Sequence, residues 1–312
     1  MKKNIHYYLI IILFLISTTL GLIIIIRRQP LHPKSKTISK YIPLKEKIAL
    51  IEIVGEIFYA YGTESFLKKD ASYIVSRINS LAERTDIKGI LIKINSPGGS
   101  VAAVQDIYNK IIEVKKKYNK PFVCYVQELC ASGGYYVAAA CDRIISSEGS
   151  VIGSIGVVLQ VGNINELLKK IGVKIEVIKS SKYKDLGSFY REMLPEEKKI
   201  LENIVNAAYE QFINAIAKGR NLSKEQVFQF ADGRIFIASQ AKQLFMIDDI
   251  GTEEKAIEEL KKLAKITDEV EIIREPTSPF DIFKHFMYEI ININLPVSKF
   301  TQKKFRLEYI LE

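Results

Sequence analysis

Histidine is scarce in this sequence of 312 residues, where it occurs only at His6, His32 and His285. Residues 33–284 therefore contain no imidazole, the side chain that most often serves as a general base. This absence excludes a Ser-His-Asp or Cys-His catalytic site in that stretch, as well as zinc hydrolysis of the HExxH type. A hydrolase built on these residues needs a lysine or a carboxylate as its base.

Cysteine is equally rare, and tryptophan is absent. The three cysteines, Cys124, Cys130 and Cys141, lie within eighteen residues on apolar segments and show no CxxC spacing. This pattern favours buried free thiols over a reactive one, and it excludes a disulfide framework. We expect neither a metal nor a cofactor. A hydrophobic content of 48% is ample for a packed core, which excludes an intrinsically disordered chain.

Acidic residues are missing from the first 45 positions, which hold eight of the 45 Lys and Arg residues. The rest of the chain carries 37 basic against 36 acidic residues, so the formal charge of +9 belongs almost entirely to the N-terminus. A nearly neutral body gives no electrostatic reason to bind nucleic acid, and no nucleic-acid partner is expected.

One long uncharged run does occur, at residues 7–26, between Lys2 and Lys3 on one side and Arg27 and Arg28 on the other. Twenty helical residues span a hydrocarbon core of about 30 Å. A cleaved signal peptide has a shorter apolar core and a small-x-small cleavage site, neither of which is visible. The sequence predicts an uncleaved transmembrane anchor over residues 1–28, followed by a Pro- and Lys-containing linker over residues 29–46.

Positive charge is greater on the C-terminal flank of this run than on the N-terminal flank. Taken alone, the positive-inside rule would keep the body of the protein in the cytoplasm.

From residue 47 onward, short β-rich runs alternate with longer segments of helical periodicity, which predicts an α/β fold with a mostly parallel sheet. We expect one domain over residues 47–275 and a C-terminal tail over residues 276–312 that packs or contacts another subunit. The expected strands are 48–54, 87–94, 122–126, 143–146 and 173–179. The expected helices are 65–83, 101–118, 133–140, 164–171, 195–218 and 253–265.

Two turns from a strand into a helix stand out, because ligand sites in α/β folds gather at such turns. The first is NSPGGS at residues 95–100, whose adjacent glycines can expose backbone N–H groups at a helix N-terminus. It suits an anion or an oxyanion, although a tight turn capped by Ser100 is the simpler interpretation.

The second turn is CASGGYY at residues 130–136. Small residues on both sides of Ser132 permit a sharp turn that presents its hydroxyl at a helix N-terminus, next to the Gly133 N–H. Alone, Ser132 is as good a helix cap as a nucleophile. Together the two turns supply a nucleophile and two sources of oxyanion donors, which acyl transfer requires. Tyr135 and Tyr136, which follow, are expected in the core rather than in a substrate groove.

A base for Ser132 has three candidates in the segment KSSKYKD at residues 179–185, namely Lys179, Lys182 and Lys184. A lysine can act as a base when burial lowers its pKa. Chemistry alone does not choose among the three, and a solvated basic loop is the simpler interpretation of the segment.

The order and spacing of several motifs resemble those of the signal peptide peptidase A (SppA) family, in its short single-repeat bacterial form. The resemblance covers roughly residues 47–265. The motifs are NSPGGS at 95–100, ASGGYY at 131–136, DRIISSEGSVIGSIGV at 142–157, YKD at 183–185 and ADGRIFIASQAKQL at 231–244.

The resemblance implies a Clp-protease/crotonase-like fold and a serine endopeptidase with a Ser/Lys catalytic dyad. By matching motifs, Ser132 is the nucleophile, Lys184 is the general base and Ser154 orients the lysine. The backbone N–H groups of Gly99 and Gly133 form the oxyanion hole.

The family also implies substrates, partners and a location. Its substrates are remnants of cleaved signal peptides and other short hydrophobic peptides, and its members are ring-like homo-oligomers in which Lys184 can serve Ser132 of a neighbouring subunit. It places the body outside the cytoplasmic membrane, and we follow it against the flank charges, because large domains translocate despite charge. Three alternatives stay open: a membrane-associated peptidase of the SohB branch, a crotonase-type acyl-CoA enzyme, and an inactive scaffold.

Overall fold

The computed structural model describes residues 12–19, 46–60, 69–274 and 308–311 of the chain. It divides into two compact units, Met1–Pro43 and Leu44–Glu312, which we describe separately.

In the first unit, residues 12–19 are helical, and the hydroxyls of Thr18 and Thr19 donate to carbonyls one turn earlier. Such bonds back to the preceding turn satisfy a hydroxyl in apolar surroundings. Within the described ranges, no helix combines the length and the apolar character that crossing a membrane requires. The remainder of the predicted anchor and the predicted linker up to residue 45 lie outside the described residues.

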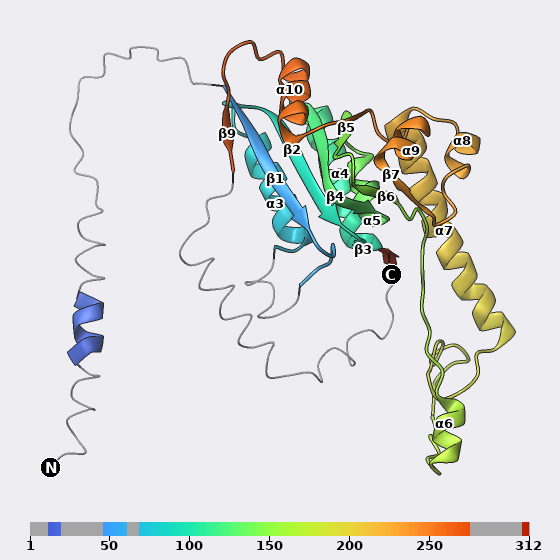
Figure 1. The fold of residues 1–312 in the computed structure, drawn as a ribbon. Helices are drawn as coiled ribbons and strands as arrows, with labels where there is room; N and C mark the ends of the chain where they lie inside the picture. Colours follow the sequence, from blue (N-terminus) through green and yellow to red (C-terminus); the bar gives the residue numbers. More distant parts are fainter. Residues whose placement is uncertain (1–11, 20–45, 61–68, 275–307, 312) are drawn as a thin grey trace. The chain divides into compact units, whose positions relative to one another are not determined.

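The second unit is built on a mixed sheet whose strands run in the order β7-β6-β4-β2-β1-β9, with β5 pairing with β4 and β8 (Figure 1). All described pairs in this sheet are parallel except β6 with β7. Its strands are β1 (Lys47–Val54), β2 (Ile87–Ser96), β4 (Phe122–Ala131), β5 (Arg143–Ser146), β6 (Val151–Gly153), β7 (Ile235–Ile237), β8 (Asp249–Ile250) and β9 (Glu271–Ile273). A separate antiparallel pair joins β3 (Gly98–Ser100) to β10 (Glu308–Ile310).

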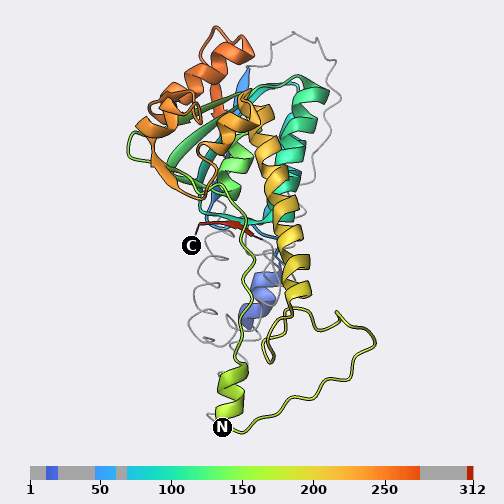
Figure 2. The same ribbon diagram turned by 90° about the vertical axis from the view of Figure 1, so that its right-hand side faces the viewer.

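Helices cover both faces of the sheet (Figures 1 and 2). They are α3 (Ala71–Ala82), α4 (Val101–Tyr118), α5 (Gly133–Ala138), α6 (Asn165–Lys170), α7 (Pro195–Arg220), α8 (Lys224–Phe228), α9 (Ala238–Gln243) and α10 (Glu253–Ala264). Side chains of β1 alternate between two cores: Ile51 and Ile53 pack with α3, α4 and α5, whereas Ile48 and Leu50 pack with α10. A sheet covered on both faces needs strands that are apolar on both faces, as these are.

The predicted α/β class is confirmed, and four of the five predicted strands are present. The predicted strand at 173–179 is wrong, because this segment forms neither helix nor strand and all seven of its residues are exposed. Its alternation of Val173, Ile175 and Val177 with charged residues is typical of an edge strand, yet no described strand lies beside it. An apolar alternation becomes a strand only where a neighbour accepts its backbone hydrogen bonds.

The long helix α7 approaches α5 closely at Gly219. A Cβ atom on Gly219 would lie 1.9 Å from the carbonyl oxygen of Ala139, which is the C-cap residue of α5. The Cβ atom is fixed to the backbone of α7, and the carbonyl oxygen is part of the backbone of α5. Neither atom can therefore move aside unless a helix shifts. The glycine therefore fixes the distance between α7 and α5.

We predict that Gly219→Ala lowers the free energy of unfolding by about 1–3 kcal/mol, because the clash outweighs the usual gain of about 0.5–1 kcal/mol for alanine in a helix. Gly149→Ala is the matched control, since a Cβ there meets no atom within 4 Å. Urea denaturation of both variants measures the difference. Equal losses, or none, would show that the two helices can move apart freely.

Candidate active site

Ser132 lies at the turn between β4 and α5, where its backbone has φ 51° and ψ −115°. A serine rarely adopts positive φ, and such strain is maintained at functional sites by the surrounding structure. Here the Ser132 N–H donates to the carbonyl of Gly153 at 2.7 Å, which ties the turn to the end of β6. The sharp turn predicted for this position is present.

The Ser132 side chain is 1% exposed, and its hydroxyl has no hydrogen-bond partner among the described residues. Ser132 occupies the N-cap position of α5, as one interpretation of the sequence had it, but its side chain makes no capping hydrogen bond. A buried hydroxyl without a partner costs about 1–3 kcal/mol. The fold thus places at a strained turn a serine hydroxyl that could act as a nucleophile and that makes no hydrogen bond to the described residues.

The glycine turn after β2 meets this serine turn directly. Gly98 has φ 106°, and a Cβ atom on it would lie 2.7 Å from the backbone nitrogen of Gly133. A Cβ on Gly133 would lie 3.2 Å from the Cα of Gly98. The two turns are therefore in backbone contact, and a side chain at Gly98 would separate them. Ser100 occupies the N-cap position of α4, as the simpler interpretation of this turn had it, but its side chain makes no capping hydrogen bond.

The direction of the Gly99 N–H follows from its neighbours. Ile57 donates its N–H to the carbonyl of Gly98 at 2.7 Å and accepts the N–H of Ser100 at 2.8 Å. Successive backbone groups of an extended strand point to opposite sides. The N–H and C=O of Gly99 therefore point away from Ile57, toward β10. The predicted oxyanion-hole residues Gly99 and Gly133 are thus on the two turns that meet.

Ser154 follows β6 and has φ 50°, a second serine in the left-handed region. It is 8% exposed, and its N–H donates to the carbonyl of Arg234 at 2.8 Å. Ser154 lies next to Gly153, the residue that accepts the Ser132 N–H. It lines a cavity of about 520 Å³, whose walls are mostly apolar. The other lining residues are Ile155, Gly156, Val157, Val158, Val205, Asn206, Tyr209, Ala231, Asp232, Gly233 and Ile310.

Lys184 is not brought to Ser132 within one chain. It belongs to residues 159–194, which we call the arm and in which no residue is buried. Both ribbon views show α6 and the segments on either side of it reaching away from the sheet and from α5 (Figures 1 and 2). The side chain of Lys184 is exposed, and its amine has no hydrogen bond or ion pair to any part of the chain that the structure describes.

The segment around Lys184 is nevertheless held by an ion cluster that the sequence did not reveal. The Arg191 guanidinium bonds both to the carboxylate of Asp185, at 2.9 Å, and to that of Glu197, at 2.6 Å. Lys179 adds a second partner for Asp185 at 2.6 Å. Hydrogen bonds from Arg191 and then Lys179 hold the pKa of Asp185 well below its usual range. Of the three candidate lysines, Lys179 and Lys182 are therefore already paired, the latter with Glu196.

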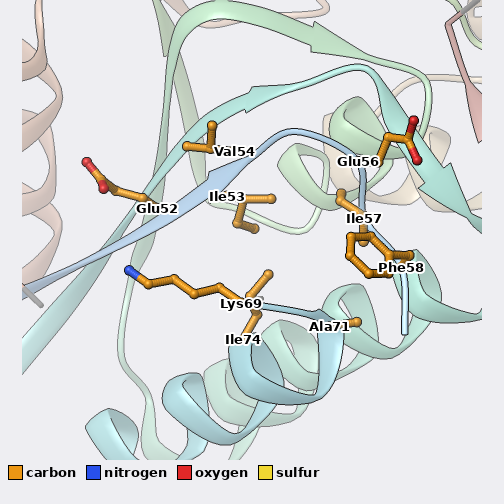
Figure 3. Close-up of a pocket in the computed structure, with 9 residues that line it drawn as sticks. All are labelled: Glu52, Ile53, Val54, Glu56, Ile57, Phe58, Lys69, Ala71 and Ile74. Carbon is orange, nitrogen blue, oxygen red and sulfur yellow. The ribbon is translucent and has the colours of Figure 1, made fainter. Parts of the chain in front are cut away.

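A second cavity, of about 250 Å³, lies between the end of β1 and the start of α3 (Figure 3). Ile57, whose backbone holds Gly98 and Ser100, forms part of its wall. None of the five predicted site residues lines it. Its lining residues are Glu52, Ile53, Val54, Glu56, Ile57, Phe58, Lys69, Ala71 and Ile74.

The C-terminal end contributes a short strand, β10, that the sequence analysis missed. β10 pairs with β3 in the register Glu308 with Ser100, Tyr309 with Gly99 and Ile310 with Gly98. Residues 308–311 are thus part of the site, whereas residues 276–307 of the predicted tail lie outside the described residues. The only sequence pattern that could have indicated this strand is the short apolar run Tyr-Ile-Leu between Glu308 and Glu312, which follows a stretch rich in Lys and Arg.

The other predictions near the site can be compared directly with the structure. Cys124, Cys130 and Cys141 are buried free thiols, as expected, and burial raises the pKa of Cys124 and Cys141. Tyr135 and Tyr136 are buried, which confirms their place in the core. Within the described ranges, no group of three or more potential ligand side chains could hold a metal.

Comparison with known proteins agrees with this geometry. Residues 114–267 match the model of peptidase family S49, and residues 56–145 match that of Clp protease. The chain is 41% identical to "Putative protease slr0021" of Synechocystis, over 73% of this chain and 78% of the relative. It is 34% identical to "Putative signal peptide peptidase SppA" of Enterococcus faecium, over 72% and 65%. It is 30% identical to "Serine protease SPPA, chloroplastic" of Arabidopsis thaliana, over 80% and 38%.

The match to family S49 includes the serine turn, the arm and the segment that carries Ser154. Together the matches favour a peptidase over the acyl-CoA enzyme and the inactive scaffold that the sequence analysis left open. The chain belongs to peptidase family S49, and it is a serine-type peptidase with a Clp-protease-like α/β domain.

Proposed function

We propose that this protein is a membrane-anchored serine endopeptidase that cleaves short hydrophobic peptides, including remnants of cleaved signal peptides. One observation carries the proposal: the hydroxyl of Ser132 is buried without a partner among the described residues at a strained turn, and this turn is in backbone contact with the glycine turn after β2. A nucleophile beside converging N–H donors is suited to attack on a peptide carbonyl.

The mechanism follows from these positions. Ser132 Oγ attacks the carbonyl carbon of the peptide, and Lys184 in its neutral form accepts the hydroxyl proton. The N–H groups of Gly99 and Gly133 stabilise the negative charge that develops on the carbonyl oxygen. The protonated amine then transfers its proton to the leaving amine, which departs. Water hydrolyses the acyl-Ser132 ester by the same route, with Ser154 orienting the lysine throughout.

Lys184 reaches this site from a neighbouring copy of the chain. Two features of the described residues support an intersubunit dyad. The arm that carries Lys184 exposes ten large apolar side chains. Exposed apolar patches of this kind normally mark interaction surfaces. The ten side chains are Ile164, Leu167, Ile171, Val173, Ile175, Val177, Ile178, Tyr183, Phe189 and Leu194. The second feature is the cavity of about 520 Å³ beside Ser154, which offers room for an incoming lysine side chain.

The substrate class follows from the walls of the site. The edge of β3 that faces away from Ile57 pairs with the extended strand β10, so its backbone groups are placed to bind an extended peptide. Ile155, Val157, Val158 and Val205 give the adjoining cavity an apolar lining. An extended apolar peptide suits both features, and one relative in Enterococcus faecium is named a signal peptide peptidase.

The uncharged run at residues 7–26 and its basic flanks support a single membrane anchor. Released signal peptides are found at the membrane, so an anchored peptidase would meet them there. We place the body on the extracytoplasmic side of the cell membrane.

We predict that Ser132→Ala and Lys184→Ala each reduce hydrolysis of a synthetic signal peptide by on the order of a thousandfold or more, because each removes a group that acts in the chemical step. Lys182→Ala is the matched control: it removes an amine from the same segment that is paired with Glu196, and it should retain most activity. Circular dichroism checks that the variants fold. Two folded variants with near-normal activity would eliminate the dyad.

Mixing tests whether the dyad is shared. Ser132→Ala chains supply an intact Lys184, and Lys184→Ala chains supply an intact Ser132. Co-assembly of the two inactive proteins should restore part of the wild-type rate, whereas each protein reassembled alone stays inactive. If mixed oligomers form, as shown by two different affinity tags, and remain inactive, the lysine and the serine act within one chain.

Removal of residues 1–45 tests the anchor. The truncated protein should move from the membrane fraction to the soluble fraction while it still cleaves a water-soluble peptide, because Ser132 and Lys184 belong to the body. In spheroplasts, externally added protease should digest the body of the full chain. Protection of the body without detergent, and digestion with it, would place the body in the cytoplasm instead.

A further inference from the structure

Ser96, the last residue of β2, is completely buried, and its hydroxyl makes two hydrogen bonds. It donates to the carbonyl of Gly55 at 2.6 Å and accepts the N–H of Gly98 at 3.1 Å. A hydroxyl that donates to one backbone group and accepts from another fixes both groups relative to each other. Ser96 therefore ties the end of β1 to the glycine turn that carries Gly99.

These two bonds belong to a closed ring of contacts around the glycine turn. From Gly55 the chain continues to Ile57, whose N–H donates to the carbonyl of Gly98 at 2.7 Å. The ring runs from the Ser96 hydroxyl to Gly55, along the chain to Ile57, across to Gly98 and back to the hydroxyl. Its other members are main-chain groups, so the Ser96 side chain is the point at which a substitution breaks the ring.

The ring holds two successive peptide planes of the glycine turn. In a trans peptide the C=O and the following N–H point in opposite directions. Ile57 binds the carbonyl of Gly98, so the N–H of Gly99 in the same plane points away from Ile57. Ser96 binds the N–H of Gly98, which belongs to the plane before. Gly98, at φ 106°, is the pivot between the two planes, and a glycine pivot needs a bond on each side to keep one orientation.

Ser96 also lies against the serine turn. In the sheet it pairs with Cys130, two residues before Ser132. A Cβ atom on Gly134, in the first turn of α5, would lie 3.0 Å from the carbonyl oxygen of Ser96 and 3.5 Å from its Cβ atom. The residue that holds the glycine turn is thus packed against the start of the helix that follows the proposed nucleophile.

We propose that Ser96 is a positioning residue for peptide hydrolysis: its hydroxyl holds the Gly99 N–H in the direction that stabilises the oxyanion formed by attack of Ser132. This inference rests on the proposed function of Ser132 and Gly99. Ser96 acts through the main chain of Gly98 and does not itself bind the substrate. Because the negative charge develops only in the transition state, a displaced donor slows the reaction more than it weakens substrate binding.

Three variants separate the hydroxyl of Ser96 from the volume of its side chain. Ser96→Ala removes the hydroxyl, Ser96→Thr keeps it, and Ser96→Val has the shape of threonine without the hydroxyl. Ser146→Ala is the matched control, since Ser146 is also fully buried and hydrogen-bonded, at the end of β5. Thermal unfolding shows that folded proteins are compared. If the larger side chains prevent folding, Ser96→Ala and the inhibitor pair described below decide.

With a synthetic signal peptide as substrate, kcat of Ser96→Ala and Ser96→Val should fall roughly 10- to 100-fold, while KM stays within about twofold of the wild-type value. Ser96→Thr should recover most of the rate, and Ser146→Ala should keep the wild-type kcat although it loses a buried hydrogen bond. A role in stability alone would lower the melting temperature of both alanine variants and leave kcat unchanged. Wild-type kcat in Ser96→Ala, or equal kcat in the folded threonine and valine variants, would overturn the inference.

A pair of inhibitors measures the oxyanion hole directly. A peptide aldehyde adds to the serine hydroxyl and places a charged oxygen in the hole, whereas the corresponding peptide alcohol cannot. The wild type should bind the aldehyde more tightly by on the order of 100-fold, and Ser96→Ala should lose about as much of this preference as it loses in kcat. An undiminished preference in Ser96→Ala would overturn this inference alone. Wild-type hydrolysis by Ser132→Ala, or no preference for the aldehyde in the wild type, would overturn the proposed function and this inference with it.

Discussion

Backbone contact between two glycine turns is the constraint on which the rest of this site depends. The Cα of Gly98 and the backbone nitrogen of Gly133 are so close that no side chain fits between them. The contact fixes where the end of β2 lies relative to the end of β4, and hence where Ser132 lies relative to the N–H of Gly99. The parallel register of β2 with β4 holds both turns at the same edge of the sheet. Helix α7 packs against the C-terminal end of α5 at Gly219, and α5 begins directly after Ser132.

A single chain brings together most of the residues of the proposed site, but not Lys184, the proposed base. Ser132, Ser154, Gly99 and Gly133 lie where β2, β4 and β6 end, at one edge of a buried sheet. Lys184 lies on an arm without a buried residue, held in shape by the ion cluster around Arg191 and Asp185. A segment that buries nothing in its own subunit gains stability only when something else covers it. In the proposed oligomer, the same contact that covers the arm would deliver the base, so an unassembled chain would lack activity against cellular peptides.

The sheet and its helices could be predicted because local pattern and tertiary environment agree there. Runs such as residues 87–94 are apolar on both faces, as a strand buried on both faces must be. The segment at 173–179 has the alternation of a strand but no neighbour in the chain, and alternation says nothing about whether a partner exists. Ser132, Gly99 and Gly133 could be proposed as site residues from the sequence, since tight turns restrict residue type. The contact between the two turns could not be predicted, because it depends on the register of the strands. β10 was missed because three residues are too short for periodicity, and their place beside β3 is set by contacts about 200 positions away.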